Sequence, residues 1–230
     1  MAEIIVALDV PDARDAMALV ERLPGLRWVK VGPMLFLRSG KGLIARLKDR
    51  GLGVFLDLKW HDIPNSVAEA VRAAAELGVD LATVHALGGE AMLRSAVAVA
   101  GPMRLAAVSV LTSHGERDYW ETVGRADGGP LLAEVRRLAA MATGAGVHAV
   151  VASPQEVAAV REVVGPERWI VTPGIRPAGA RLDDQRRTAD PATAAAAGAT
   201  HLVVGRPITR ADDPGAVYES VSRAAAGTDA

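Results

Sequence analysis

Two lysines stand at the ends of apolar runs, where a charged side chain is unexpected. Four of the 26 basic residues are lysines, and Lys41 and Lys48 lie in a charged amphipathic stretch typical of a solvated helix face. Lys30 and Lys59 instead end apolar segments. Lysine can give up a proton usefully, whereas arginine cannot. Lys30 and Lys59 are therefore the first candidates for proton-transfer chemistry.

Carboxylates accompany both of these lysines. Asp57 and Lys59 are two residues apart in an expected strand, so their side chains should lie on the same face. Asp62 follows shortly after, and Asp9 ends the first apolar run of the chain. Nearby carboxylates favour the charged form of lysine, and a protonated lysine can act as a general acid. A structural ion-pair network is the alternative, but burying so many charges for stability alone is unfavourable.

A second set of residues has the chemistry of phosphate binding. Segments 173–176 and 205–206 follow two later apolar runs, and their glycines can expose backbone N–H groups to an anion. The guanidinium forks of Arg176 and Arg206 suit a phosphate dianion. Gln185 adds an amide donor if its loop folds over the site. Solvated surface residues are the alternative for each of them.

Short, nearly continuous apolar runs alternate with helical patterns along the chain, as in parallel strands covered on both faces. The expected strands are 4–8, 28–31, 54–58, 81–85, 105–111, 149–152, 169–172 and 201–204. The expected helices are 13–23, 35–50, 66–77, 90–100, 131–144, 154–164, 191–197 and 214–226. Repeated strand–helix units over residues 1–230 predict an α/β protein with a single (β/α)8 TIM barrel domain. A doubly wound open sheet is the alternative.

In such a barrel the active site lies at the carboxyl ends of the strands, where both sets of candidate residues fall. The longest connection follows the fifth expected strand and holds the polar segment 113–129. We expect this segment to be a loop on the catalytic face and a candidate lid, with a plain surface insertion as the alternative. The tail, 227–230, is expected to be frayed and disordered.

Composition excludes several classes of function. The net charge is −1 and no basic tract occurs, which argues against nucleic acid as the principal partner, and Arg186 and Arg187 are expected to be solvated. Without cysteine the chain forms no disulfide and no thiolate site.

The chain has no apolar run of the ~18 residues that a membrane span needs, so we expect no membrane contact and a soluble, cytoplasmic protein. The histidines lack metal-ligand spacing, so no metal is expected, and His85 is expected to be a hydrogen-bonded structural imidazole.

Segment 57–65, Asp-Leu-Lys-Trp-His-Asp-Ile-Pro-Asn, resembles the D-x-K-x-x-D-I-P-N signature of the orotidine 5′-phosphate decarboxylase family. Segments 8–9, 29–32, 110–113, 172–176, 183–186 and 203–208 are also similar to that family, in its order. The resemblance extends over residues 4–222. It implies a cofactor-free homodimeric decarboxylase that converts orotidine 5′-phosphate to UMP and CO₂, the last step of de novo pyrimidine biosynthesis.

The resemblance also implies a role for each matching residue. Lys59 is expected to protonate C6 of the pyrimidine, and an ammonium held by carboxylates can stabilise the C6 carbanion without reorganisation. The other implied roles are Asp57 near the departing carboxylate, Asp9 and Lys30 at the ribose hydroxyls, Asp62 in the partner subunit's site, Ile63 in the apolar pocket, Ser66 at the ribose across the dimer, Thr112 near the pyrimidine, and Arg176, Gln185, Gly205 and Arg206 at the phosphate. Position 66 is usually threonine in the family, and Ser66 keeps the hydroxyl.

Three other functions are alternatives to the decarboxylase that the resemblance implies. A Mg²⁺-dependent sugar-phosphate decarboxylase or aldolase of the same barrel group shares the D-x-K-x-x-D pattern, but resembles a site with a glutamate metal ligand where this chain has Lys30. An aldolase could instead form a Schiff base with Lys59. A non-catalytic nucleotide-binding protein would bind the nucleotide without turnover.

Overall fold

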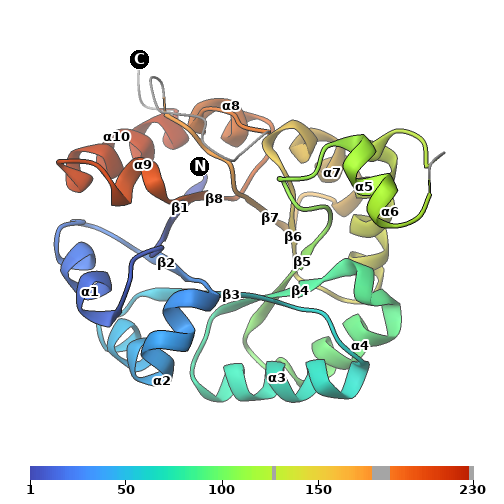
Figure 1. Ribbon diagram of the computed structural model, residues 1–230. Helices are drawn as coiled ribbons and strands as arrows, with labels where there is room; N and C mark the ends of the chain where they lie inside the picture. Colours follow the sequence, from blue (N-terminus) through green and yellow to red (C-terminus); the bar gives the residue numbers. More distant parts are fainter. Residues whose placement is uncertain (126–127, 178–186, 228–230) are drawn as a thin grey trace.

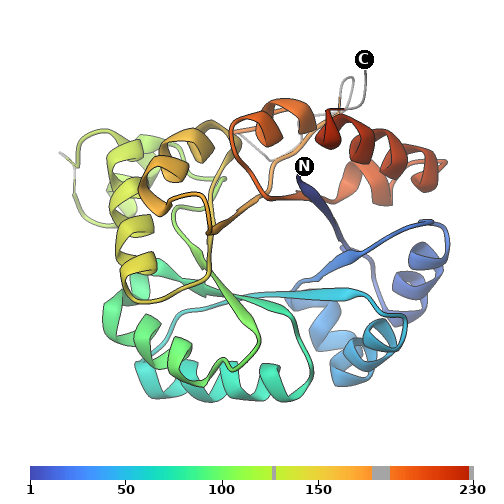
Figure 2. The ribbon, with the colours of Figure 1, turned by 180° about the vertical axis from the view of Figure 1, so that it is seen from behind.

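The computed structural model describes residues 1–125, 128–177 and 187–227. Within these residues, parallel strands close a barrel in the order β1 to β8, and β8 is hydrogen-bonded to β1. Figures 1 and 2 show this ring of strands from opposite sides, surrounded by helices. The strands are β1 (Glu3–Ala7), β2 (Trp28–Val31), β3 (Gly53–Trp60), β4 (Leu81–His85), β5 (Arg104–Val108), β6 (Ala149–Val151), β7 (Trp169–Thr172) and β8 (His201–Val204). The predicted single-domain TIM barrel is confirmed.

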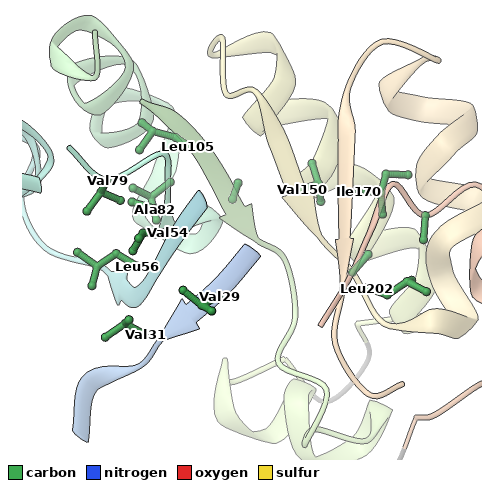
Figure 3. Close-up of a cluster of buried hydrophobic side chains, with 14 of the residues drawn as sticks. Val29, Val31, Val54, Leu56, Val79, Ala82, Leu105, Val150, Ile170 and Leu202 are labelled. Atoms are coloured by element: carbon green, nitrogen blue, oxygen red, sulfur yellow. The ribbon is translucent and has the colours of Figure 1, made fainter. Parts of the chain in front are cut away.

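The strands carry apolar side chains on both faces because both faces are buried. Val29 and Val31 of β2, with Leu56 of β3, belong to the large cluster between the strands and the helices (Figure 3). Phe55, which lies next to Leu56 in the chain, packs instead in a smaller cluster inside the barrel. Each fully buried side chain of this size contributes roughly 1.5–3 kcal/mol. The same alternation turns Lys30, between Val29 and Val31, toward the barrel interior.

The helices of the described residues begin and end at recognisable signals. Proline occupies the first turn of several of them, and the Asp12 side chain caps the first, accepting from the backbone N–H of Asp15 at 3.0 Å. Gly227 ends the last helix with φ of 70°, and residues 228–230 of the predicted tail lie outside the described residues. The helices are α1 (Ala13–Glu21), α2 (Pro33–Asp49), α3 (Pro64–Glu76), η1 (Ala86–Gly88), α4 (Gly89–Val99), α5 (Glu116–Thr122), α6 (Leu131–Gly144), η2 (Pro154–Glu156), α7 (Val157–Val164), α8 (Pro191–Ala196), α9 (Arg206–Thr209) and α10 (Pro214–Ala226). None of these helices is long and apolar enough to cross a bilayer.

Two strand ends differ from the prediction by more than one residue. Strand β3 continues to Trp60, two residues further than expected, and β5 stops at Val108, three residues early. After Val108, the Ser109 hydroxyl turns back and donates to the carbonyl oxygen of Val151 at 2.9 Å. The Ser109 backbone N–H donates to the same oxygen at 3.4 Å, and the ladder ends there, so apolar composition alone overestimates the length of β5.

Segment 113–129, predicted as a polar loop, contains helix α5 and an apolar anchor. Tyr119 and Trp120 are buried, the Tyr119 hydroxyl donates to Glu134 Oε1 at 3.1 Å, and Trp120 Nε1 donates to the carbonyl oxygen of Gly129 at 2.7 Å. Burial, reinforced by the Glu134 carboxylate, raises the pKa of Tyr119 to about 12. The phenol therefore stays protonated as a donor. The expected polar segment thus contains a short helix, whose aromatic side chains hold it against α6 and Gly129.

Candidate active site

A cavity of about 340 Å³ opens at the carboxyl ends of the strands. Apolar side chains of the barrel interior, among them Phe55 and Val171, line it together with charged groups. The predicted site residues that line it are Asp9, Lys30, Asp57, Lys59, Thr112, Arg176, Gly205 and Arg206. These residues come from β1, β2, β3, β5, β7 and β8 or the loops that follow them, so the closed barrel brings distant parts of the sequence to one cavity.

Four charged side chains at the carboxyl ends of three neighbouring strands form a row of alternating sign. Lys30 Nζ lies 3.2 Å from Asp9 Oδ1 and 3.7 Å from Asp57 Oδ2. Lys59 Nζ lies 2.9 Å from both carboxylate oxygens of Asp57. The side chains of Lys30 and Asp57 are each 13% exposed, whereas that of Lys59 is 39% exposed. Asp57 is thus shared by two ammonium groups, and Lys59 keeps an open side toward the cavity.

The contact between Asp57 and Lys59 lies at an irregularity in β3. Lys59 has φ of 52°, and among the described residues it is the one non-glycine residue with a positive φ. The register between β3 and β4 also shifts between Leu56 and Trp60. A backbone in this region costs about 1–3 kcal/mol for a residue with a side chain. The two side chains meet on one face as predicted, since Asp57 and Lys59 line the cavity whereas Leu58 packs against the outer cluster.

The loops after β7 and β8 form another wall of the cavity. Gly174 has φ of 82°, a conformation that favours glycine. At Gly205, a Cβ atom would lie 3.4 Å from Asp9 Oδ2, so this backbone borders the charged row at contact distance. Arg176 and Arg206 line the same cavity. This wall combines positive charge with glycine-rich backbone, which is the chemistry that a phosphate group requires.

Three other predicted site residues, all described in the structure, do not line this cavity. Asp62, Ile63 and Ser66 are exposed around the start of α3, and the Ile63 backbone N–H donates to Asp62 Oδ1 at 2.6 Å. Any contact between these three side chains and a ligand in a cavity of this kind therefore has to involve another copy of the chain or a rearrangement. Gln185 lies outside the described residues.

Arg187, predicted on a solvated surface, is largely buried. Its side chain is 11% exposed, its guanidinium pairs with the buried Glu156, and its Nη2 donates to the carbonyl oxygen of Leu111 at 2.9 Å. Glu156 also accepts from the backbone N–H of Ser153 at 2.9 Å. The prediction for Arg187 is wrong because its partner is 31 positions away, and nothing in its own loop indicates burial. Arg186 lies outside the described residues.

His85 forms the structural hydrogen bond that the sequence predicts. Its Nδ1 accepts from the backbone N–H of Leu87 at 3.4 Å, and its ring stacks on His61 with centroids 5.3 Å apart. Burial lowers the pKa of His85 to about 4, and the nearby His61 and Lys59 act in the same direction. The imidazole is therefore neutral near pH 7, which allows Nδ1 to act as the acceptor.

Comparison with known proteins identifies the family of the chain. The model of the orotidine 5′-phosphate decarboxylase / HUMPS family matches residues 2–221. The orotidine 5′-phosphate decarboxylase of Halorhodospira halophila is 52% identical, with 97% of each chain covered. That of Alkalilimnicola ehrlichii is 50% identical, with 99% of this chain and 98% of the relative covered.

A solved structure has the same fold over the whole chain. The crystal structure of orotidine 5′-phosphate decarboxylase from Lactobacillus acidophilus aligns with a TM-score of 0.86 and 35% sequence identity, covering 100% of both chains. Sequence and fold therefore lead to one conclusion: the chain belongs to the orotidine 5′-phosphate decarboxylase / HUMPS family.

Proposed function

We propose that the protein decarboxylates orotidine 5′-phosphate to UMP and CO₂, a step of pyrimidine biosynthesis. The observation that carries this proposal is the alternating row of Asp9, Lys30, Asp57 and Lys59 in one cavity with the two arginines of the β7 and β8 loops. Two relatives that are 52% and 50% identical over nearly their whole length bear the name of this activity.

Lys59 is the proposed proton donor. The bond between C6 and the carboxylate breaks, its electron pair stays on C6, and a proton from the Lys59 ammonium forms the new C6–H bond. The ammonium is already held 2.9 Å from Asp57, so it stabilises the developing negative charge without reorganising. Losing one preorganised donor of this kind costs about 3–4 kcal/mol in catalysis. Asp57 lies beside the departing carboxylate, and Lys59 regains its proton from solvent after CO₂ leaves.

The remaining walls of the cavity hold the substrate. We assign the ribose hydroxyls to Asp9 and Lys30, and the pyrimidine ring to the neighbourhood of Thr112. The phosphate is assigned to four residues of the β7 and β8 loops: Arg176, Gln185, Gly205 and Arg206. Because these contacts are remote from C6, their binding energy can position the base against Lys59.

An apolar patch supports a homodimer. Met34, Leu37, Ile63 and Leu87 are exposed by 44%, 83%, 66% and 39%. They belong to α2, the start of α3 and η1, which follow the neighbouring strands β2, β3 and β4 at the carboxyl end of the barrel. Large apolar side chains gathered on one rim of a barrel mark an interaction surface rather than isolated exposure.

We propose that this surface pairs with a second copy and that the two active sites are shared. Asp62 and Ser66 lie beside the patch, exposed and outside the cavity of their own chain. In a dimer formed through the patch, Asp62, Ile63 and Ser66 reach the partner subunit's site, with Ser66 at the ribose and Ile63 at the apolar part of the pocket.

A Mg²⁺-dependent reaction on a sugar phosphate fits these residues less well. A divalent cation needs free oxygen ligands, whereas Asp9 and Asp57 are paired with the ammonium groups of Lys30 and Lys59. A cation placed between them would be repelled by both lysines. We therefore propose chemistry with neither metal nor organic cofactor.

Segment 113–129 is proposed to close over the bound nucleotide. Ser113 lines the cavity, and the anchor at Tyr119 and Trp120 leaves the start of the segment as the part able to adjust.

We also propose that the protein is cytoplasmic, since a phosphorylated nucleotide is too highly charged to cross a bilayer unaided.

The test is a decarboxylation assay with purified protein in excess chelator. Orotidine 5′-phosphate should be consumed with equal amounts of UMP and CO₂ formed, and orotidine without phosphate should react far more slowly. Activity that disappears with chelator and returns with Mg²⁺ would favour the metal-dependent alternative. Nucleotide binding without product would favour the non-catalytic one.

A further inference from the structure

We propose that Thr83, a residue outside the cavity lining, positions the Lys59–Asp57 pair; the inference deepens the proposed function and rests on it. Thr83 lies in β4 and is 1% exposed. Its Oγ1 accepts a hydrogen bond from the backbone N–H of Lys59 at 2.8 Å and donates one to Asp57 Oδ1 at 3.1 Å. One hydroxyl thus contacts the main chain of the proposed proton donor and the carboxylate that holds its ammonium.

The strand register explains why the Lys59 N–H has this partner. Leu56 pairs with Ala82 and Trp60 pairs with Val84, so residues 57–59 of β3 lie opposite Thr83 alone. Such a bulge interrupts the regular hydrogen bonds between the two strands. The Thr83 side chain therefore replaces a backbone acceptor at the point where Lys59 takes its left-handed φ of 52°.

The Thr83 hydroxyl has a single proton, so it can donate only one hydrogen bond. The Lys59 N–H can be only a donor, so Thr83 Oγ1 accepts from it and gives its own proton to the Asp57 carboxylate. Asp57 Oδ1 then accepts from Thr83 and from Lys59 Nζ. Removing the hydroxyl leaves a buried N–H and a buried carboxylate oxygen each short of one partner, and releases the strained backbone.

Thr83→Val is the direct test, because valine keeps the branched shape and lacks the hydroxyl. We expect kcat for orotidine 5′-phosphate to fall about 10- to 100-fold, as two buried hydrogen bonds are lost at the reacting pair. KM should change less than about threefold, since no phosphate contact is touched. Thr83→Ser keeps the hydroxyl and should restore kcat to within about threefold of the parent.

Thr200→Val is the matched control at the opposite end of the barrel. Thr200 Oγ1 also accepts from a backbone N–H, that of Ile170 at 2.9 Å, at the start of β8 and away from the cavity. Its loss should leave kcat unchanged within about twofold while lowering stability in the same way. A Thr83→Val enzyme that is folded and has the parent kcat overturns the proposal, as does an equal fall in the valine and serine variants.

The geometry provides a second readout that needs no turnover. A crystal structure of Thr83→Val should show that Lys59 leaves φ near 52° or that its Nζ moves out of hydrogen-bond distance of Asp57. Unchanged geometry overturns the positioning role, whereas an inactive parent enzyme refutes the proposed function alone. If the valine variant does not fold, Thr83→Ala lacks the same hydroxyl and receives both measurements.

Discussion

A single carboxylate organises the charges of the cavity. Asp57 accepts from Lys59 at 2.9 Å, lies 3.7 Å from Lys30, and is largely buried. Its negative charge is therefore balanced twice, and the ammonium of Lys59 stays in one place facing the cavity. Because the surroundings of a partly buried ion pair are less polarisable than water, this arrangement acts on a bound substrate more strongly than the same charges would in solution.

The phosphate-binding role of the Arg206 guanidinium, at the other wall of the cavity, can be tested by replacing the residue with alanine. Arg206→Ala should raise KM for orotidine 5′-phosphate about 10- to 100-fold and weaken UMP binding similarly, because a charge-assisted contact to the phosphate is lost. Binding of uridine, which lacks the phosphate, should not change. Arg210→Ala, at the exposed end of the same short helix, is the control. An unchanged KM for Arg206→Ala would show that the phosphate lies elsewhere.

The identity of the charged residues could be predicted from the sequence, but the backbone conformation at Lys59 could not. Lys30 and Lys59 are conspicuous because lysine is scarce and both end apolar runs. The left-handed backbone at Lys59 has no local signal, since neither glycine nor asparagine marks the position. It depends on Thr83 in the next strand, and long-range partners of this kind are invisible to local pattern.

Among the elements, the loops after β5, β6 and β7 are tied together by one buried ion pair. Arg187 follows β7, its carboxylate partner Glu156 follows β6, and the carbonyl oxygen of Leu111 follows β5. Burial lowers the pKa of Arg187, but the Glu156 carboxylate and the Leu111 carbonyl oxygen compensate its buried positive charge. The loops that border the cavity therefore share a common support.

Arg187→Met should lower the free energy of unfolding by about 3–5 kcal/mol, because it leaves the Glu156 carboxylate buried without its cation. Urea-induced unfolding measures this change. Arg136→Met breaks an exposed ion pair with Glu162 and should cost less than about 1 kcal/mol. Equal losses in the two variants would contradict the support assigned to Arg187.

The regular elements follow from the sequence more closely than the loops do. Four of the expected strands, 28–31, 81–85, 169–172 and 201–204, have the observed bounds, because strands buried on both faces leave a continuous apolar run. Helix α5 was not predicted, since its residues are mostly polar and its two buried aromatic side chains pack against a neighbour further along the chain.

At the scale of the whole molecule, the end of the barrel opposite the cavity is closed by aromatic rings. His201 is 4% exposed, its Nδ1 lies 2.9 Å from Thr200 Oγ1, and its ring packs against Trp28 and Trp169. Burial, with a smaller contribution from Arg104, lowers the pKa of His201 from 6.5 to about 4. The folded protein therefore keeps this imidazole neutral where the unfolded chain would protonate it.

The free energy of unfolding should therefore decrease as the pH falls. The stability contributed by neutral His201 is complete above pH 6.5 and is lost as the pH falls toward 4, because the unfolded chain then binds the additional proton. Between pH 7.5 and 5, the His201→Phe variant should lose about 2 kcal/mol less stability than the parent. Denaturant unfolding of the parent and of the variant at both pH values measures how much stability each loses. Equal losses in the two proteins would show that His201 is not protected from protonation.

Shared active sites predict recovery of activity by mixing. Lys59→Ala and Asp62→Ala subunits should each be inactive alone. Hybrid dimers regain one complete site, with Lys59 from one subunit and Asp62 from the other, so the mixture should reach up to about a quarter of parent activity if exchange is random. Native mass spectrometry with a mass-tagged subunit confirms the exchange. Inactive mixtures with verified hybrids would contradict a shared site.

The central claim, that the Lys59 ammonium delivers the proton to C6, is tested most directly by CO₂ release from Lys59→Ala. Lys41→Ala, which alters an exposed lysine of α2, is the control and should behave as the parent does. We predict that Lys59→Ala loses roughly a thousandfold or more in kcat, as expected for removal of a general acid that also stabilises the carbanion, while it still binds UMP. Near-parental CO₂ release by folded Lys59→Ala would contradict the account.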